Sequence, residues 1–360
     1  MLKVAVCLGT RPEIIKMSPI IRALIDEKIE YFILHSGQHY SYNMDKLFFE
    51  ELNLPAPKYN LNVGSGTHAS MTAKIMEESE KIFLDEKPTH VFVQGDTNTV
   101  LGCSMGAFKI EGIKLCHVEA GLRSNLWYMP EEKNRVIVDH ISDILFAPTK
   151  ESVKLLKKEG IPSKRIFLTG NTIVDATIQN IKLKDETETL SKFNLEKKKF
   201  IIVTVHRQEN VDNKNSLLSI SNAINELSND YTILWPIHPR TKERIKEFNI
   251  IINKSIKIVE PIGYLDFLNL IKNASLVLTD SGGLQEESCI LKTPCVTLRE
   301  NTERPETLKA GSNMLSKLDK KKIIKTVNVM IKRKPRWKNP FGDGFAAKKI
   351  INILKSERKS

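Results

Sequence analysis

The most informative segment of the chain combines glycines with polar side chains directly after an apolar run. In residues 279–287 (TDSGGLQEE), Ser281, Gly282 and Gly283 follow a predicted strand and begin a predicted helix. Small residues let the backbone approach a phosphate closely, and the N–H groups at a helix N-terminus favour an anion. Glu287 follows in the same helix, where it could accept hydrogen bonds from ribose hydroxyls. The alternative is an ordinary glycine-rich turn with Glu287 on a solvated face.

Four cationic side chains lie where they could join such an anion site. Each belongs to the start of a predicted helix or to the loop after a predicted strand: Arg11, Lys16, His206 and Arg304. A charge-assisted hydrogen bond contributes roughly 1.5–3 kcal/mol, whereas an exposed helix N-terminus contributes only about 0.3–1 kcal/mol. Arg11, Arg304 and His206 would therefore dominate the binding of a diphosphate. Each also fits a structural role, as a surface basic residue, a salt bridge or a core histidine.

Carboxylates follow two predicted strands and begin one predicted helix. Asp96 and Glu119 follow the strands, and Glu131 and Glu132 begin the helix. Each has a structural alternative, because Asp96 could cap a helix, Glu119 could pair with Arg123, and acids near a helix start offset its dipole. Three acids that converge on a cleft with a bound diphosphate would suit acid–base chemistry on a nucleotide-linked substrate.

The elements that must position these residues are short apolar runs that alternate with amphipathic segments. Such runs are typical of parallel strands that are buried on both faces and connected by helices. Predicted helices include 12–26 and 98–109. The predicted strands are 2–8, 31–35, 90–94, 114–118, 144–147 and 165–168 in the first half, and 200–205, 232–236, 256–259, 275–279 and 295–298 in the second.

Two successive series of this kind predict an α/β fold with two Rossmann-like, doubly wound domains. We expect an N-terminal domain at 1–170, onto which a C-terminal helix at 344–356 could pack back, and a second domain at 171–343. The charged stretch 183–199 is the best candidate boundary segment. Ligands of open α/β sheets bind beyond the carboxyl ends of the strands, so two such domains facing each other would hold one site in a central cleft.

Composition excludes several other classes of protein. The 360 residues contain 55 Lys+Arg and 43 Asp+Glu, a formal net charge of +12. No zinc-finger or RNP-like motif favours nucleic acid, and no apolar run approaches the roughly 20 residues of a membrane-spanning helix. The phosphate-loop and G-x-G-x-x-G motifs are absent, which disfavours ATPase and NAD chemistry. The five cysteines form no C-x-x-C pair, so we expect a reduced, cytoplasmic protein without a metal site.

The ordered set of motifs resembles the non-hydrolysing UDP-N-acetylglucosamine 2-epimerases. The matching segments run from residue 9 to residue 313: GTRPEIIKMSPII, SGQHY, VQGDTNTV, HVEAGLRS, PEEKNR, TVHRQEN, TDSGGLQEE and TERPETLKAGSN. The resemblance implies a GT-B-like fold, a homodimer, and interconversion of UDP-N-acetylglucosamine and UDP-N-acetylmannosamine without a cofactor or metal. It also implies that UDP-N-acetylmannosamine is supplied for surface polysaccharide or glycan synthesis.

The resemblance also assigns roles to residues. It implies that Asp96, Glu119 and Glu131 are the catalytic acids, with Glu132 as a weaker substitute for Glu131, and that His206 lies near the diphosphate. It implies substrate contacts for the remaining matched positions, with Phe267 near the uracil: Arg11, Lys16, Phe267, Ser281, Gly282, Gly283, Glu287 and Arg304.

The chain departs from the family pattern at a few positions. Ile262 replaces a glutamine, so a uracil contact there would use the main chain. Gln38 and His39 match part of the segment that binds a second, activating substrate molecule in bacterial members. However, Ser41 replaces a glutamine and the stretch 63–67 lacks an arginine, so the resemblance does not establish activation by substrate for this chain.

The same sequence features are compatible with three other functions. A hydrolysing 2-epimerase would release UDP and free N-acetylmannosamine, and a GT-B glycosyltransferase would need an acceptor. A sensor would bind UDP-sugars without turnover.

Overall fold

The computed structural model describes residues 2–37 and 42–357, which divide into two compact units. The first contains the chain up to Gln179 together with the segment from Phe341 onward, and the second runs from Asn180 to Pro340. Each unit is built on a parallel sheet whose strands are connected by helices, as the alternating pattern predicts. Gln38, His39 and Ser41 lie outside the described residues.

The sheet of the first unit has the strand order β3-β2-β1-β4-β5-β6-β7 among the described residues. Its strands are β1 (Lys3–Leu8), β2 (Glu30–His35), β3 (Tyr59–Asn60), β4 (His90–Gln94), β5 (Lys114–Val118), β6 (Ile144–Ala147) and β7 (Ile166–Leu168). Its helices are α1 (Arg11–Asp26), α2 (Tyr42–Glu51), α3 (His68–Glu86), α4 (Asn98–Ala107), α5 (Pro130–Ile141), α6 (Lys150–Lys158), α7 (Thr172–Asn180), the 3-10 helix Ser163–Arg165 and the C-terminal α16 (Ala346–Glu357).

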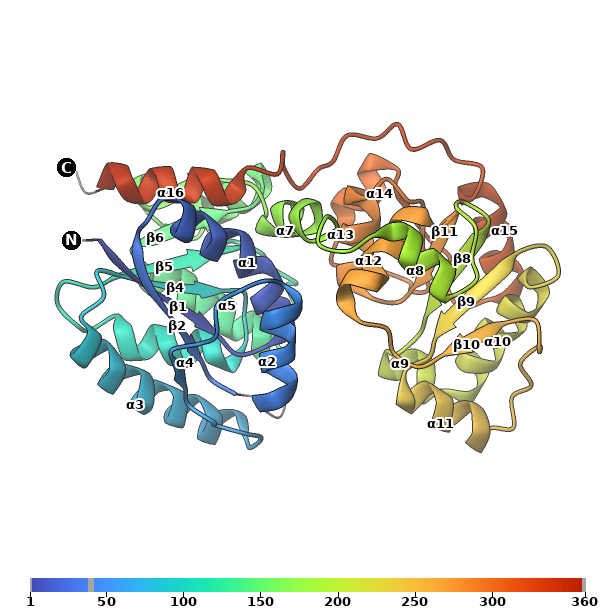
Figure 1. Cartoon of the computed structure of the whole chain (residues 1–360), viewed down its shortest axis with the longest axis horizontal. Coiled ribbons are helices and arrows are strands. Elements are labelled where there is room, and N and C mark those ends of the chain that lie inside the picture. Colours follow the sequence, from blue (N-terminus) through green and yellow to red (C-terminus); the bar gives the residue numbers. More distant parts are fainter. Residues whose placement is uncertain (1, 38–41, 358–360) are drawn as a thin grey trace. The chain divides into compact units, whose positions relative to one another are not determined.

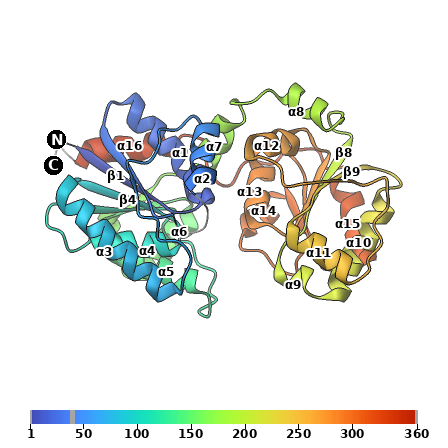
Figure 2. The ribbon, with the colours of Figure 1, turned by 60° about the horizontal axis from the view of Figure 1, so that its bottom comes forward.

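Helices cover both faces of this sheet, because side chains of a strand point alternately to opposite faces. Ala5 and Cys7 of β1 face a cluster that includes Ile75 and Phe83 of α3. Figures 1 and 2 show α3 and α4 on that face, and α1 and α16 side by side on the other. Both surfaces of the strands are therefore buried, which explains their nearly continuous apolar sequences.

The second unit repeats the scheme with the strand order β10-β9-β8-β11-β12-β13. Its strands are β8 (Phe200–Thr204), β9 (Thr232–Pro236), β10 (Lys257–Val259), β11 (Leu276–Thr279), β12 (Cys295–Thr297) and β13 (Asn313–Leu315). Its helices are α8 (Glu186–Lys192), α9 (Gln208–Val211), α10 (Lys214–Leu227), α11 (Pro239–Glu247), α12 (Tyr264–Asn273), α13 (Gly282–Ile290), α14 (Pro305–Ala310) and α15 (Lys320–Met330). Ile201 and Val203 face α10 and α15, whereas Phe200 and Ile202 face α12.

The units divide nine residues after the expected position at 170, because α7 packs with the C-terminal segment. Asp175 of α7 accepts hydrogen bonds from the backbone N–H groups of Ala346 and Ala347, at 3.2 and 3.0 Å, and so caps the start of α16. The backbone N–H of Asn171 donates to the carbonyl of Phe341 at 2.9 Å.

In both sheets the first strand of the unit lies inside the sheet, and the chain adds later strands first on one side of it and then on the other. β1 lies between β2 and β4, and β8 lies between β9 and β11. Loops that leave the carboxyl ends of strands on either side of such a point diverge and leave room for a ligand. The predicted site segments after β1, β4, β8 and β11 all leave these two switch points.

Two findings concern function classes that composition already disfavours. No helix in the described part of the chain is long and apolar enough to cross a membrane. Within residues 2–37 and 42–357, no group of three or more His, Cys, Asp or Glu side chains is arranged to hold a metal ion.

Candidate functional site

Glu119 lies at the centre of a polar cluster at the carboxyl ends of β4 and β5. Its side chain is almost fully buried, and both carboxylate oxygens face the ammonium of Lys16, at 2.7 and 2.6 Å. The side-chain amides of Gln94 and Asn171 donate to the same carboxylate. These donors favour the ionised form of Glu119.

The backbone of Glu119 has a φ of 71°, in the left-handed region that a non-glycine residue rarely adopts. Such a conformation costs about 1–3 kcal/mol and persists only where surrounding contacts fix it. This backbone conformation turns the chain sharply after β5, so that the Glu119 carboxylate lies beside the end of β4. The structure therefore gives Glu119 a cationic partner from α1 in place of the local pair with Arg123.

Asp96 follows β4 and forms an ion pair with Arg135 of α5. Its side chain is about a quarter exposed. Burial raises the pKa of Asp96 above its ordinary value, against the opposing charge of Arg135, and the negative charges of Glu119 and Glu131 raise it further. The three predicted acids are therefore near enough to interact electrostatically. Thr97, rather than Asp96, caps the next helix by accepting from the backbone N–H of Val100 at 3.3 Å.

Glu131 and Glu132 both lie in the first turn of α5 but have different surroundings. Glu132 is buried and accepts hydrogen bonds from the backbone N–H groups of Ser124 and Asn125, at 2.8 and 3.0 Å. Arg135 also contacts it at 2.9 Å. Glu132 therefore holds the loop before α5 in place, whereas Glu131 is only partly buried and interacts with the charge of Asp96.

The loop after β1 is organised by a buried carboxylate that sequence reasoning did not single out. Glu13 accepts from the backbone N–H groups of Gly9 and Thr10, both at 2.7 Å, and from the hydroxyl of Thr97 at 2.5 Å. It forms a capping box with Thr10, the N-cap residue that precedes α1. The predicted anion ligand Arg11 is the first residue of this helix, and its guanidinium carbon lies 5.5 Å from the ring centroid of Phe48.

In the second unit, Asp280 orients His206. The carboxylate of Asp280 is fully buried and lies 2.8 Å from Nδ1 of His206. It also accepts from the backbone N–H groups of His206 and Arg207 and from the side-chain amide of Asn210. Burial alone would raise the pKa of Asp280, but these contacts bring it below the ordinary value. Nδ1 therefore carries a hydrogen, and Nε2 is left to act as an acid or base.

The glycine-rich turn begins α13 next to this pair. Ser281 is the N-cap residue, and Gly282 and Gly283 are the first two helical residues. A Cβ added to Gly283 would have no heavy atom within 4 Å, and one added to Gly282 would meet only Glu303, at 3.8 Å. The backbone at the start of α13 thus borders open space. Glu287 is buried rather than on a solvated face.

The last two predicted contacts lie on neighbouring elements. Arg304 precedes α14, and its Nε donates to the buried carboxylate of Glu286 at 2.6 Å, so the salt bridge is not a surface pair. Phe267 of α12 is partly buried and packs with Ile262 against the core of the second unit.

The predicted site residues therefore form one group in each unit. In the first unit, Lys16, Asp96, Glu119 and Glu131 are brought together, and Arg11 begins the same helix that carries Lys16. In the second unit, His206, Ser281, Gly282 and Gly283 belong to the loops after β8 and β11. That the two groups act on one ligand stays a prediction.

Comparison with known proteins identifies the family of the chain. The sequence model of the family described as UDP-N-acetylglucosamine 2-epimerase matches residues 22–355. The chain belongs to the UDP-N-acetylglucosamine 2-epimerase family. It is thus an epimerase, an isomerase, as the motifs predict.

Individual relatives agree with this assignment. The UDP-N-acetylglucosamine 2-epimerase of Methanocaldococcus jannaschii is 55% identical over 362 residues, which cover 98% of this chain and 99% of that protein. A crystal structure of the M. jannaschii UDP-GlcNAc 2-epimerase, in complex with UDP-GlcNAc and UDP, superposes with a TM-score of 0.86 at 56% identity and covers 99% of this chain and 100% of that one. The α/β fold of GT-B-like epimerases is thereby confirmed.

A more distant relative has a different substrate in its name. The UDP-2,3-diacetamido-2,3-dideoxy-D-glucuronate 2-epimerase of Pseudomonas aeruginosa is 36% identical over 357 residues, which cover 98% of this chain and 99% of that protein. The family therefore includes epimerases of more than one UDP-sugar.

Proposed function

We propose that this protein interconverts UDP-N-acetylglucosamine and UDP-N-acetylmannosamine by elimination and re-addition of UDP, without net hydrolysis. The observation that carries the proposal is the group of three carboxylates, Asp96, Glu119 and Glu131, at the carboxyl edge of the first sheet. The similarity to the M. jannaschii enzyme supports UDP-N-acetylglucosamine as the substrate.

The chemistry of the sugar explains why several acids are needed. The hydrogen on C2 is not adjacent to a carbonyl, so its direct removal is unfavourable. Departure of UDP from C1 makes that carbon electron-deficient and acidifies the C2 hydrogen, and a base then removes it to leave 2-acetamidoglucal. A proton must return to C2 from the opposite face while UDP adds back to C1. Two groups on opposite faces of the ring are therefore required.

The surroundings of Asp96 and Glu119 suit complementary roles in this reaction. Lys16 favours the ionised form of Glu119, which makes that carboxylate a candidate base. The raised pKa of Asp96 makes it the better candidate proton donor, with Glu131 as the third member of the set.

The departing UDP needs a separate anion site. His206, whose Nδ1–H is held by Asp280, could donate from Nε2 to the departing diphosphate. The backbone N–H groups at the start of α13 and the guanidinium of Arg304 are candidate partners for the phosphates. Arg11 is a further candidate by its match to the family motif. Phe267 and Glu287 are candidates for the uracil and the ribose.

An NMR assay of the purified protein with UDP-N-acetylglucosamine tests the proposal. We expect a second anomeric signal from UDP-N-acetylmannosamine that grows to a fixed ratio without net release of UDP. Release of UDP and N-acetylmannosamine as the main products would favour a hydrolysing epimerase. Saturable binding without any product, in the presence or absence of sugar acceptors, would favour a sensor.

Parallel variants decide whether the named acids carry the reaction. Asp96→Asn and Glu119→Gln should each lower kcat by at least about 100-fold, because each removes a proton-transfer group. Glu132→Gln is the matched control, since Glu132 binds the loop before α5 and should affect stability more than kcat. The same assay with UDP-2,3-diacetamido-2,3-dideoxy-D-glucuronate determines whether the P. aeruginosa substrate is also accepted.

Further implications of the family resemblance stay predictions. These are a homodimer, a cytoplasmic location and supply of UDP-N-acetylmannosamine for polysaccharide synthesis.

A further inference from the structure

His117 is a buried histidine whose two ring nitrogens both face hydrogen-bond acceptors. It lies in β5 and has no exposed surface. Its Nδ1 lies 2.7 Å from Oδ1 of Asp139, and its Nε2 lies 2.9 Å from the carbonyl oxygen of Gly95. A carbonyl oxygen can only accept, so Nε2 must carry a hydrogen. An ionised carboxylate can also only accept, so the state of Asp139 decides whether Nδ1 carries one as well.

The surroundings of Asp139 keep it ionised. Its second oxygen lies 2.7 Å from the guanidinium of Arg123 and accepts the backbone N–H of Gly121 at 3.1 Å. Burial alone would raise the pKa of Asp139, but the contacts with His117 and Arg123 bring it below the ordinary value. Hydrogen bonds from Arg123 and Gly121 to the Asp139 carboxylate stabilise its ionised form.

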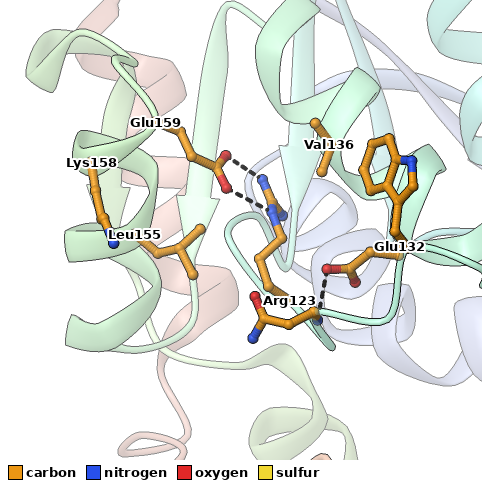
Figure 3. A pocket seen from close by; sticks show the side chains of 8 residues that line it. Arg123, Glu132, Val136, Leu155, Lys158 and Glu159 are labelled. Atoms are coloured by element: carbon orange, nitrogen blue, oxygen red, sulfur yellow. Dashed lines mark hydrogen bonds and ion pairs between the residues drawn. The ribbon is translucent and has the colours of Figure 1, made fainter.

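The guanidinium of Arg123 is shared between two carboxylates. Arg123 forms two further hydrogen bonds with Glu159, at 3.0 and 2.7 Å, which are drawn as dashed lines in Figure 3. Both residues line a pocket of 480 Å³ on the first unit. Glu159 is partly exposed and also lies 3.6 Å from Nε2 of His140. Because Arg123 divides its charge between Glu159 and the fully buried Asp139, an imidazolium at His117 would complete the balance of the Asp139 charge, and a buried charge is expensive unless it is balanced.

His117 contacts the backbone next to the proposed catalytic acids. Gly95 immediately precedes Asp96, and its φ of 84° is a conformation that glycine adopts without strain. Glu119 lies two residues after His117, immediately beyond the end of β5, in the strained conformation described above. Asp139 adds a contact to the backbone N–H of Gly121, just beyond Glu119. One buried ion pair thus contacts the loops that carry both acids.

We propose that His117 is a positioning residue: an imidazolium, protonated at neutral pH, that fixes the Gly95–Asp96 turn against β5 and thereby sets the position of Asp96 relative to Glu119. The catalytic consequence rests on the proposed epimerase function. The protonation state of His117 does not depend on that function, so either claim can be refuted without the other.

NMR of the unliganded, full-length protein with ¹⁵N-labelled histidine tests the protonation state. The His117 ring signals are assigned in the wild-type protein through correlations to its own backbone resonances, so the assignment needs no variant. We expect both ring nitrogens of His117 to carry hydrogens at pH 7.5. A neutral ring, with one nitrogen unprotonated at that pH, would overturn the proposal whatever the enzyme catalyses.

Two substitutions then separate positioning from simple stabilisation. The amide of glutamine reaches the place of Nε2 and can still donate to Gly95, whereas the amide of asparagine reaches only the place of Nδ1. We expect His117→Asn to lower kcat by roughly 10- to 100-fold, as for other misplaced catalytic groups. His117→Gln should keep kcat within about 5-fold, and KM should change less than about 3-fold in both variants.

His90→Gln is the matched control, because His90 is a buried histidine at the amino end of β4 and should leave kcat unchanged. Equal loss of kcat in the two His117 variants, or no loss in folded His117→Asn, would refute the positioning role. If the wild-type protein has no epimerase activity, the proposed function fails, and the NMR experiment still decides whether the imidazolium exists. It also decides the matter if both variants fail to fold.

Discussion

Substitution of Gly283 by alanine should separate the stability of the second unit from its proposed ligand site. Gly283 is the second residue of α13, and an added methyl group would meet no heavy atom within 4 Å. Alanine is favoured over glycine inside a helix by up to about 1 kcal/mol, and less in the first turn. We therefore expect the free energy of unfolding to rise by about 0.5 kcal/mol.

The same methyl group should interfere with a diphosphate. In the proposed site, phosphate oxygens approach the backbone N–H groups at the start of α13, and a Cβ would occupy the space beside them. Loss of one charge-assisted hydrogen bond costs roughly 1.5–3 kcal/mol, which corresponds to an affinity for UDP about 10- to 150-fold weaker. The reaction rate at low substrate concentration should fall by a similar factor.

Calorimetric titration with UDP and urea unfolding monitored by fluorescence measure the two effects in the same variant. The unfolding measurement is the internal control, because it shows that weaker binding does not come from a damaged fold. Unchanged UDP affinity in Gly283→Ala would refute phosphate binding at this turn. A clear loss of stability would show that the space beside Gly283 is not open.

Three further substitutions test other parts of the site. Lys16→Met removes the ammonium that faces buried Glu119 and should lower the free energy of unfolding of the first unit by about 3 kcal/mol. In urea unfolding, adding Glu119→Gln to this variant should restore part of the lost stability. Additive effects of the two substitutions would contradict the ion pair. Asp280→Asn removes the carboxylate that orients His206 and should lower kcat about 100-fold in steady-state assays; an unchanged kcat would exclude this orienting role. Burial raises the pKa of Glu13 from 4.5 to about 7, so its native form favours the proton. The free energy of unfolding should therefore fall by about 3 kcal/mol as pH rises from 4.5 through 7. In urea unfolding between pH 5 and 8, Glu13→Gln should show a smaller fall than the wild-type protein. An equal pH dependence of the two proteins would refute a raised pKa at Glu13.

The fold was predictable where burial dictates the sequence. The long internal strands are continuous apolar runs, so their positions could be read to within a residue or two, as for β4 and β5. The edge strands β3 (Tyr59–Asn60) and β13 (Asn313–Leu315) were missed. They are two and three residues long and exist because they pair with β2 and β12, a relation that no local pattern reveals.

The candidate site was predictable in its residue types and less so in its pairings. Glycines and acids after strands pointed to the carboxyl ends of both sheets, and the structure places these residues there. The ion pair of Glu119 joins residues 103 positions apart, so local sequence favoured Arg123, which instead contacts Asp139 and Glu159. Polar residues at the ends of buried strands, such as Gln94, were the available signal for the remaining partners.

The reaction in deuterium oxide shows whether a proton is removed from C2 after UDP leaves C1. UDP-N-acetylglucosamine is incubated with the protein until the two sugars reach a fixed ratio, and C2 is examined by NMR and mass spectrometry. We predict deuterium at C2 of both the product and the recovered substrate. An epimer that retains the original C2 hydrogen would contradict the account.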